Sequence, residues 1–226
     1  PPAVLPRGDA LASARRFEDG PRIYGCGDGP GALDAAAHQI TGTLHMGGQE
    51  HFYLEGQAAL AVPGEDGDML IHSSTQHPSE VQHGVAHTLG VPTNAVMVEI
   101  RRMGGGFGGK ESQPTIIAAI AALLAHQTGR PAKLRLRRDD DMIVTGKRHD
   151  FLYRYEAGFD AEGRVEAIDI LMGMRSGNVA DLSPGVLARA LCHADNCYYL
   201  PNAIFRGYPC KTNTVSPTAC RGFGRP

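Results

Sequence analysis

The sequence has 226 residues, with 22 basic and 24 acidic side chains and a formal net charge of −2. This balance gives no indication of binding to nucleic acid or to an anionic membrane. A hydrophobic content of 42% excludes a disordered chain, and the longest apolar stretch, residues 115–125, is too short to span a bilayer.

The first third of the chain contains short elements separated by glycine and proline. Residues 1–37 are rich in Pro, Gly and charge and are expected to be a linker or the end of a preceding domain, with a short helix over 31–38 at its end. A strand then leads into residues 44–46. Two further strands, 58–62 and 69–72, flank a Pro-Gly-Glu-Asp-Gly turn.

The middle of the chain predicts two helices and two strands. Val81, Val85 and Leu89 recur at helical spacing, which predicts a helix that begins at Pro78 and stops at Gly90. A strand at 95–100 precedes a helix over 115–127 that is apolar on all sides, so we expect that helix to be buried on most sides. A strand at 133–138 would complete a β-α-β unit.

The last part of the chain predicts a hairpin, a helix and a strand. Residues 151–159 and 165–174 flank an Asp-Ala-Glu-Gly turn and indicate an antiparallel hairpin. A helix over 183–193 and a strand near 204–210 follow. The fold class expected from this order is α+β, with mixed sheets and packed helices.

The most informative motif is the run Gly104–Gly109, in which five of six residues are glycine. Such a loop, between a strand and a helix, lets a ligand approach the backbone closely. It matches the P-loop pattern up to Lys110, but Glu111 replaces the hydroxyl that would hold Mg²⁺. A nucleotide-binding module using loop 104–109 and a tight turn without a ligand both stay open at this point.

A second glycine cluster, residues 218–224, presents Arg221 and Phe223 from a flexible backbone. An arginine offers a rigid fork of donors for oxyanions, and a phenylalanine offers a stacking surface for a planar ring. Taken alone, an ordinary surface loop is the simpler interpretation.

Other polar groups have simpler interpretations. His83 and His87 have the spacing of paired metal ligands but lack the intervening Glu, so we expect solvated histidines. Charged residues 135–141 are interpreted as a solvated strand edge and turn, and Glu50 and Glu55 as structural hydrogen-bond acceptors. The 5 cysteines show no C-x-x-C spacing, which favours reduced thiols and a cytoplasmic location.

Five strings occur in an order that resembles the molybdenum-cofactor-binding portion of xanthine dehydrogenases, within the wider molybdenum hydroxylases. The resemblance runs from about His38 to the end of the chain. It rests on these segments: Gly47–Glu55 (GGQEHFYLE), Ser74–Gln76 (STQ), Arg102–Glu111 (RMGGGFGGKE), Arg189–His193 (RALCH) and Arg221–Phe223 (RGF).

The resemblance implies roles for individual residues. Glu111 and Arg189 would be the catalytic pair that clasps a purine, and Phe223 would pack against its ring. None of the residues at the cofactor would ligate the metal directly, although Gln76, Phe107 and Arg221 would lie near molybdenum. The residues that would contact the cofactor are Gln76, Gly106, Phe107, Gly108 and Arg221.

The resemblance also implies the wider function. Residues 38–226 would be the N-terminal part of a truncated molybdopterin-binding domain that takes part in hydroxylation of hypoxanthine or xanthine to urate. The 2Fe-2S and FAD groups would lie on other domains or subunits of an oligomeric enzyme. We expect the chain to lack the catalytic base and therefore to be inactive on its own. A non-catalytic assembly piece, folded by contacts with other segments, is a second hypothesis. A hydroxylase of aldehydes or other N-heterocycles is the alternative within the family.

Overall fold

The computed structural model describes residue 17 and residues 20–224. Within these residues the chain divides into two compact units, and each contains one sheet. The five-stranded unit consists of the described residues up to 49, 148–217 and from 222 onward; the four-stranded unit consists of 50–147 and 218–221. Both units combine helices with a sheet of mixed strand direction, which confirms the α+β prediction.

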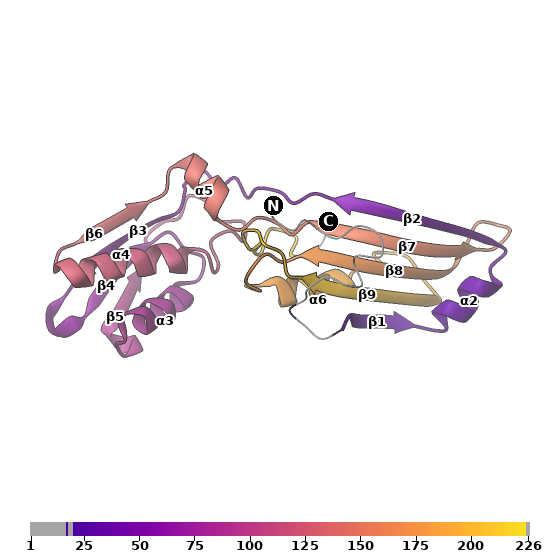
Figure 1. The fold of residues 1–226 in the computed structure, drawn as a ribbon, viewed down its shortest axis with the longest axis horizontal. Helices are drawn as coiled ribbons and strands as arrows, with labels where there is room; N and C mark the ends of the chain where they lie inside the picture. The colour runs from indigo at the N-terminus through magenta and orange to yellow at the C-terminus, as the bar shows by residue number, and fades with distance from the viewer. Residues whose placement is uncertain (1–16, 18–19, 225–226) are drawn as a thin grey trace. The chain divides into compact units, whose positions relative to one another are not determined.

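The five-stranded unit has the strand order β1-β9-β8-β7-β2 (Figure 1). The expected hairpin is present, because β7 and β8 are antiparallel. Strands β8 and β9 are parallel and joined through α6, which packs against β9. The elements of the unit are β1 (Arg22–Cys26), α2 (Gly29–Ala35), β2 (His38–Met46), β7 (Phe151–Phe159), β8 (Val165–Arg175), α6 (Ser183–Cys192) and β9 (Asn202–Cys210).

Part of the segment expected to be a linker is an ordered piece of this unit. Strand β1 pairs with β9, and α2 follows it directly. Asp28 caps α2 by accepting a hydrogen bond from the Gly31 N–H at 3.1 Å, and Leu33 is buried. The glycines and the proline at residues 27–31, which contributed to the linker prediction, therefore belong to a capped helix start. The rest of that prediction, residues 1–16, 18 and 19, lies outside the described residues.

The four-stranded unit has the strand order β5-β4-β3-β6. Strand β5 is parallel to β4, and β4 and β6 are both antiparallel to β3, so β5 and β6 run in the same direction. The predicted β-α-β connection through α4 is thus present, but two strands lie between its ends. The elements are β3 (Ala58–Pro63), β4 (Met69–Ser73), α3 (Pro78–Leu89), β5 (Val96–Glu99), α4 (Pro114–Thr128), β6 (Ala132–Arg135) and α5 (Arg138–Val144), with 3-10 turns at Glu65–Gly67 and Thr93–Ala95.

Helix α4 contradicts the expectation that it is buried on most sides. Helices α3 and α4 pack beside each other, and α4 packs on β3 and β6 (Figure 1). Its alanines, including Ala118 and Ala121, face the core, whereas Ile116 is 61% exposed. Small side chains let the helix approach the sheet closely, and the larger ones then point outward. The exposed large side chains of α4 are Ile116, Ile120, Leu123 and Leu124.

Candidate functional site

The glycine-rich loop connects β5 to α4 in the four-stranded unit, and two of its glycines are required by close contacts. A Cβ atom on Gly106 would overlap the side-chain amide of Gln76. A Cβ atom on Gly108, where φ is +94°, would lie 2.7 Å from the carbonyl oxygen of Ala219. Between them Phe107 takes a left-handed backbone conformation with φ of 54°, and it is 47% exposed. The loop is therefore shaped by contacts that larger residues would prevent.

Gln76 is held against this loop by three hydrogen bonds. Its Oε1 accepts from the N–H groups of Gly108 at 2.9 Å and Lys110 at 3.2 Å. The backbone N–H of Gln76 donates to the Lys110 carbonyl at 2.7 Å. Because Oε1 binds two donors, the orientation of the side-chain amide is determined, and Nε2 is left without a partner within the described residues. Gln76 is exposed and thus presents a fixed hydrogen-bond donor.

Backbone donors of the loop are also unused. Within the described residues, the N–H groups of Gly105, Gly106 and Phe107 donate no hydrogen bond. The sign of φ changes from Gly105 to Gly106 and again at Phe107, and such alternation is typical of backbone concavities that bind anions. With Gln76 Nε2, the loop offers four donors to an oxygen-rich group. This donor set, beside glycines that leave no space for a side chain, fits the group that the sequence predicts.

The second glycine cluster is joined to the first in this unit. The Arg221 N–H donates to the Phe107 carbonyl at 2.8 Å. The carbonyl oxygen of Ala219 accepts from His51 Nε2 at 2.6 Å, so the His51 ring carries its proton on Nε2. The structure therefore brings together all the residues that the sequence predicts at the cofactor, from three separate segments: Gln76, Gly106, Phe107, Gly108 and Arg221.

A buried polar cluster lies under the loop, and most of it was not predicted. Asp141, interpreted from the sequence as part of a solvated turn, is 2% exposed and lies in helix α5, which was not predicted. Its carboxylate accepts from the Tyr53 hydroxyl at 2.7 Å and the Gln57 N–H at 2.9 Å. Gln57 Nε2 then donates to the Gly109 carbonyl at 3.0 Å. Burial and the neighbouring Asp141 raise the pKa of Tyr53, so it stays a hydroxyl donor.

The residues expected at the substrate are divided between the units. Glu111 is half-buried in the four-stranded unit, two residues after the loop. Arg189 is an exposed residue of α6 in the five-stranded unit, which also contains Phe223. The Phe223 ring approaches Gly185 on the same helix and packs against its buried residues. Arg189 and Phe223 thus both belong to the surroundings of α6.

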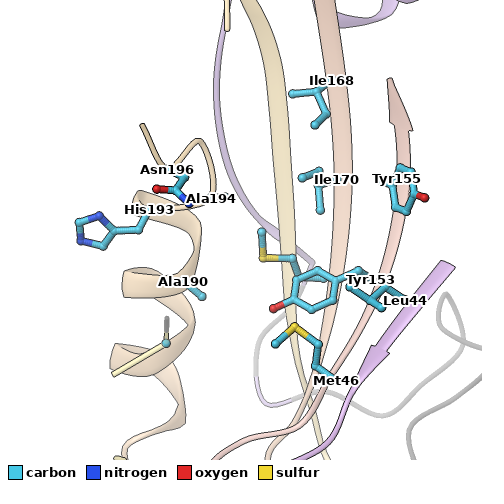
Figure 2. A pocket seen from close by; sticks show the side chains of 12 residues that line it. Leu44, Met46, Tyr153, Tyr155, Ile168, Ile170, Ala190, His193, Ala194 and Asn196 are labelled. Atoms are coloured by element: carbon cyan, nitrogen blue, oxygen red, sulfur yellow. The ribbon is translucent and has the colours of Figure 1, made fainter. Parts of the chain in front are cut away.

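The five-stranded unit also contains an apolar cavity of about 540 Å³. Figure 2 shows it between Tyr153, Leu44 and Met46 on the sheet and Ala190 and His193 on or just after α6. Burial raises the pKa of Tyr153 to about 12, so its hydroxyl stays protonated. Neither Arg189 nor Phe223 lines this cavity. The residues that line it are Leu44, Met46, Tyr153, Tyr155, Ile168, Ile170, Met172, Ala190, His193, Ala194, Asn196 and Gly224.

Three further sequence interpretations can be compared with the structure. His83 and His87 are exposed on α3, as expected of solvated histidines. Across the described residues, no three His, Cys, Asp or Glu side chains gather in a way that could hold a metal ion. Glu55 is a structural acceptor, as expected, with a hydrogen bond from Ser74 Oγ at 2.7 Å. No helix in the described part of the chain is long and apolar enough to cross a membrane.

Two similar proteins each match most or all of this chain. The chain is 48% identical over 201 residues to "Xanthine dehydrogenase/oxidase" of Gallus gallus, which covers 88% of this chain and 15% of the relative. It is 46% identical to the protein of the same name from Felis catus, over 100% of this chain and 17% of the relative. The chain thus spans about one sixth of the length of these relatives.

Solved structures share the fold. "Aldehyde Oxidoreductase from Desulfovibrio gigas" superposes with a TM-score of 0.82 and 26% identity, over 93% of this chain and 23% of that one. Quinoline 2-oxidoreductase from Pseudomonas putida 86 superposes with a TM-score of 0.77 and 20% identity, over 92% of this chain and 27% of that one. The family model described as "Molybdopterin cofactor-binding domain" matches residues 16–226. With the loop geometry above, this match shows that the chain belongs to the molybdopterin cofactor-binding domain family.

Proposed function

We propose that the four-stranded unit binds a molybdenum–pterin cofactor at the glycine-rich loop. The observation that carries this proposal is the set of four unused donors, Gln76 Nε2 and the N–H groups of residues 105–107, beside the Arg221 segment. When bound, the molybdenum centre supplies the two-electron oxidation and the oxygen transfer to carbon. The chain's residues would bind and orient it: Gln76, Gly106, Phe107, Gly108 and Arg221 through their side chains or backbone.

A nucleotide-binding role for the same loop is less well supported. In a P-loop the lysine must reach the phosphates of the ligand. Here Lys110 is 0% exposed, and its Nζ donates to Ser74 Oγ at 2.6 Å. A lysine held in this way under the loop has no access to a phosphate above it.

The substrate we propose is a purine, hydroxylated as part of a longer xanthine dehydrogenase. The support is the similarity to xanthine dehydrogenase/oxidases, at 46–48% identity, and the presence here of Glu111 and Arg189. Glu111 would hydrogen-bond the ring nitrogens and orient the purine, and Phe223 would pack against the ring. Arg189 would stabilise the negative charge that develops on the ring in the transition state.

Partners and location follow from the same proposal. The chain corresponds to 15–17% of relatives whose remaining length is available for other domains. We place the 2Fe-2S and FAD groups on those domains or on other subunits of an oligomeric enzyme. The cytoplasm is the proposed location, supported by an odd number of cysteines, 5, without a C-x-x-C spacing.

The cofactor proposal is tested by Gly106→Ala in the full-length protein. The added methyl group would displace the Gln76 amide, so we expect the molybdenum content per protein, measured by elemental analysis, to fall at least about tenfold. Gly47→Ala is the matched control, because nothing lies within 4 Å of the position of its Cβ atom. Full molybdenum content in Gly106→Ala, or none in the wild-type protein, overturns the proposal.

The substrate proposal is tested by Arg189→Met, with the exposed Arg164→Met as control. Loss of a charge that acts only in the transition state predicts a fall of about a hundredfold in kcat for xanthine, measured as urate formation. Oxidation of a simple aldehyde, which develops no charge on a purine ring, should change little. Equal losses on both substrates would favour the aldehyde or N-heterocycle alternative.

A further inference from the structure

Lys110 directly follows the glycine-rich loop, and its side chain is completely buried beneath the loop. Its Nζ donates to Ser74 Oγ at 2.6 Å, pairs with Glu55 Oε2 at 3.4 Å and lies 4.7 Å from the centre of the Tyr53 ring. Its main chain holds Gln76, because its N–H binds the Gln76 side chain and its carbonyl binds the Gln76 N–H. Any movement of Lys110 therefore moves the donor that Gln76 presents.

Glu55 binds the opposite end of the same loop. Its N–H donates to the Gly104 carbonyl at 3.0 Å, and its Oε2 accepts from the Gly104 N–H at 2.8 Å. The same oxygen accepts from Ser74 Oγ and Lys110 Nζ. Burial alone would raise the pKa of Glu55, but these hydrogen bonds and the charge of Lys110 outweigh it and lower the pKa, so the carboxylate stays ionised.

The pair is better suited to setting geometry than to adding stability. Desolvation of a buried lysine offsets much of its attraction to a carboxylate, and an apolar residue of similar volume often replaces such an ion without loss of stability. The Glu55 side chain is 43% exposed and could be hydrated without its partner. What an apolar residue could not replace is the link between the two ends of the loop.

We propose that Lys110 and Glu55 are a positioning pair, which holds Gly104 and Gln76 so that the donors of the loop are fixed before the cofactor binds. This inference rests on the proposed cofactor site. Neither side chain is a catalytic residue, because Lys110 lies beneath the loop and Glu55 is bound to Gly104. Their effect on the cofactor is transmitted by the loop backbone and by Gln76.

The test is Lys110→Met in the full-length protein, with Lys133→Met on strand β6 as the matched control, since Lys133 is exposed. We expect hydrogen–deuterium exchange of the peptide that covers Gly104–Lys110 to accelerate about tenfold, in the range set by one hydrogen bond to a charged group. Exchange in β3 and β4 should stay unchanged. Molybdenum should be lost during dialysis about tenfold faster.

The possible results separate the positioning pair from the proposed cofactor site. Wild-type exchange in Lys110→Met overturns the positioning pair, and so does faster exchange with an unchanged rate of molybdenum loss. Molybdenum absent from the wild-type protein overturns the proposed function, and with it the cofactor part of this inference. If Lys110→Met does not fold, the double variant Lys110→Met/Glu55→Gln, which removes both charges, must show the same faster exchange; wild-type exchange in that variant rejects the pair.

Discussion

The residues proposed to act on cofactor and substrate are supported in two different ways. In the four-stranded unit, the loop is held by hydrogen bonds and charges, with Asp141 and Lys110 buried beneath it. In the five-stranded unit, α6 rests on an apolar core that includes Leu187 and Leu191, both 2% exposed or less. Hydrogen bonds fix the direction of a donor, whereas apolar packing fixes only the place of a helix. The comparison predicts that replacing a single buried polar residue disturbs the donors of the four-stranded unit specifically.

The largest effect is expected from Asp141→Ala. Removal of the carboxylate leaves the Tyr53 hydroxyl and the Gln57 N–H buried without their acceptor, which should lower the free energy of unfolding by about 3–5 kcal/mol. Denaturant unfolding measures this change. Asp139→Ala, at an exposed position of the same helix, should cost no more than about 1 kcal/mol. Similar losses in both variants would show that burial of the carboxylate is not the cause.

The apolar counterpart is Leu187→Ala in α6. Leu187 is 0% exposed, so the cavity created should lower the free energy of unfolding by about 3 kcal/mol. Molybdenum content should nevertheless stay close to wild type, because the cofactor donors are held by other contacts. Leu54→Ala, at a position that is 91% exposed, serves as control. A loss of molybdenum as large as that in Gly106→Ala would remove the distinction between the two units.

A pH effect should come from His149 in the five-stranded unit. His149 is 3% exposed and its Nε2 lies 2.7 Å from Ser183 Oγ; burial and the charge of Arg175 lower its pKa from 6.5 to about 3. The folded state therefore holds the ring neutral, and its contribution to stability is complete above pH 6.5. As the pH falls from about 6.5 toward 3, the unfolded chain takes up a proton first, and stability falls by at most about 1.4 kcal/mol per pH unit.

The His149 prediction is measured by unfolding at a series of pH values. The difference in stability between the wild type and His149→Gln should shrink as the pH drops below 6.5, since only the wild type carries the ring. A difference that is constant from pH 7 to pH 4 would contradict it.

The smallest effect on stability is expected for Arg189→Ala. The side chain is on the exposed side of α6, so the free energy of unfolding should change by no more than about 0.5 kcal/mol. This makes any loss of xanthine turnover attributable to substrate binding or chemistry. A large loss of stability would instead indicate a structural role for Arg189.

Local patterns in the sequence were sufficient for most elements of the fold. The spacing of Val81, Val85 and Leu89 predicted α3, which ends where Gly90 takes a left-handed conformation with φ of 69°. The turn residues at 160–163 predicted the hairpin of β7 and β8. These features depend on neighbours a few residues apart, and periodicity and turn chemistry report such neighbours directly.

Contacts between distant segments had no such signature. The apolar pattern of α4 did not show that its alanines would face the sheet, because a helix that is apolar on all sides gives no preferred face. Lys110 is buried against Glu55, which lies 55 positions away in the sequence. Asp141 is buried against Tyr53, which lies 88 positions away. The sequence alone thus determined most of the elements and where the glycine-rich loop lies. Only the tertiary structure decided which charges became buried beneath the loop, since that depends on segments brought together by folding.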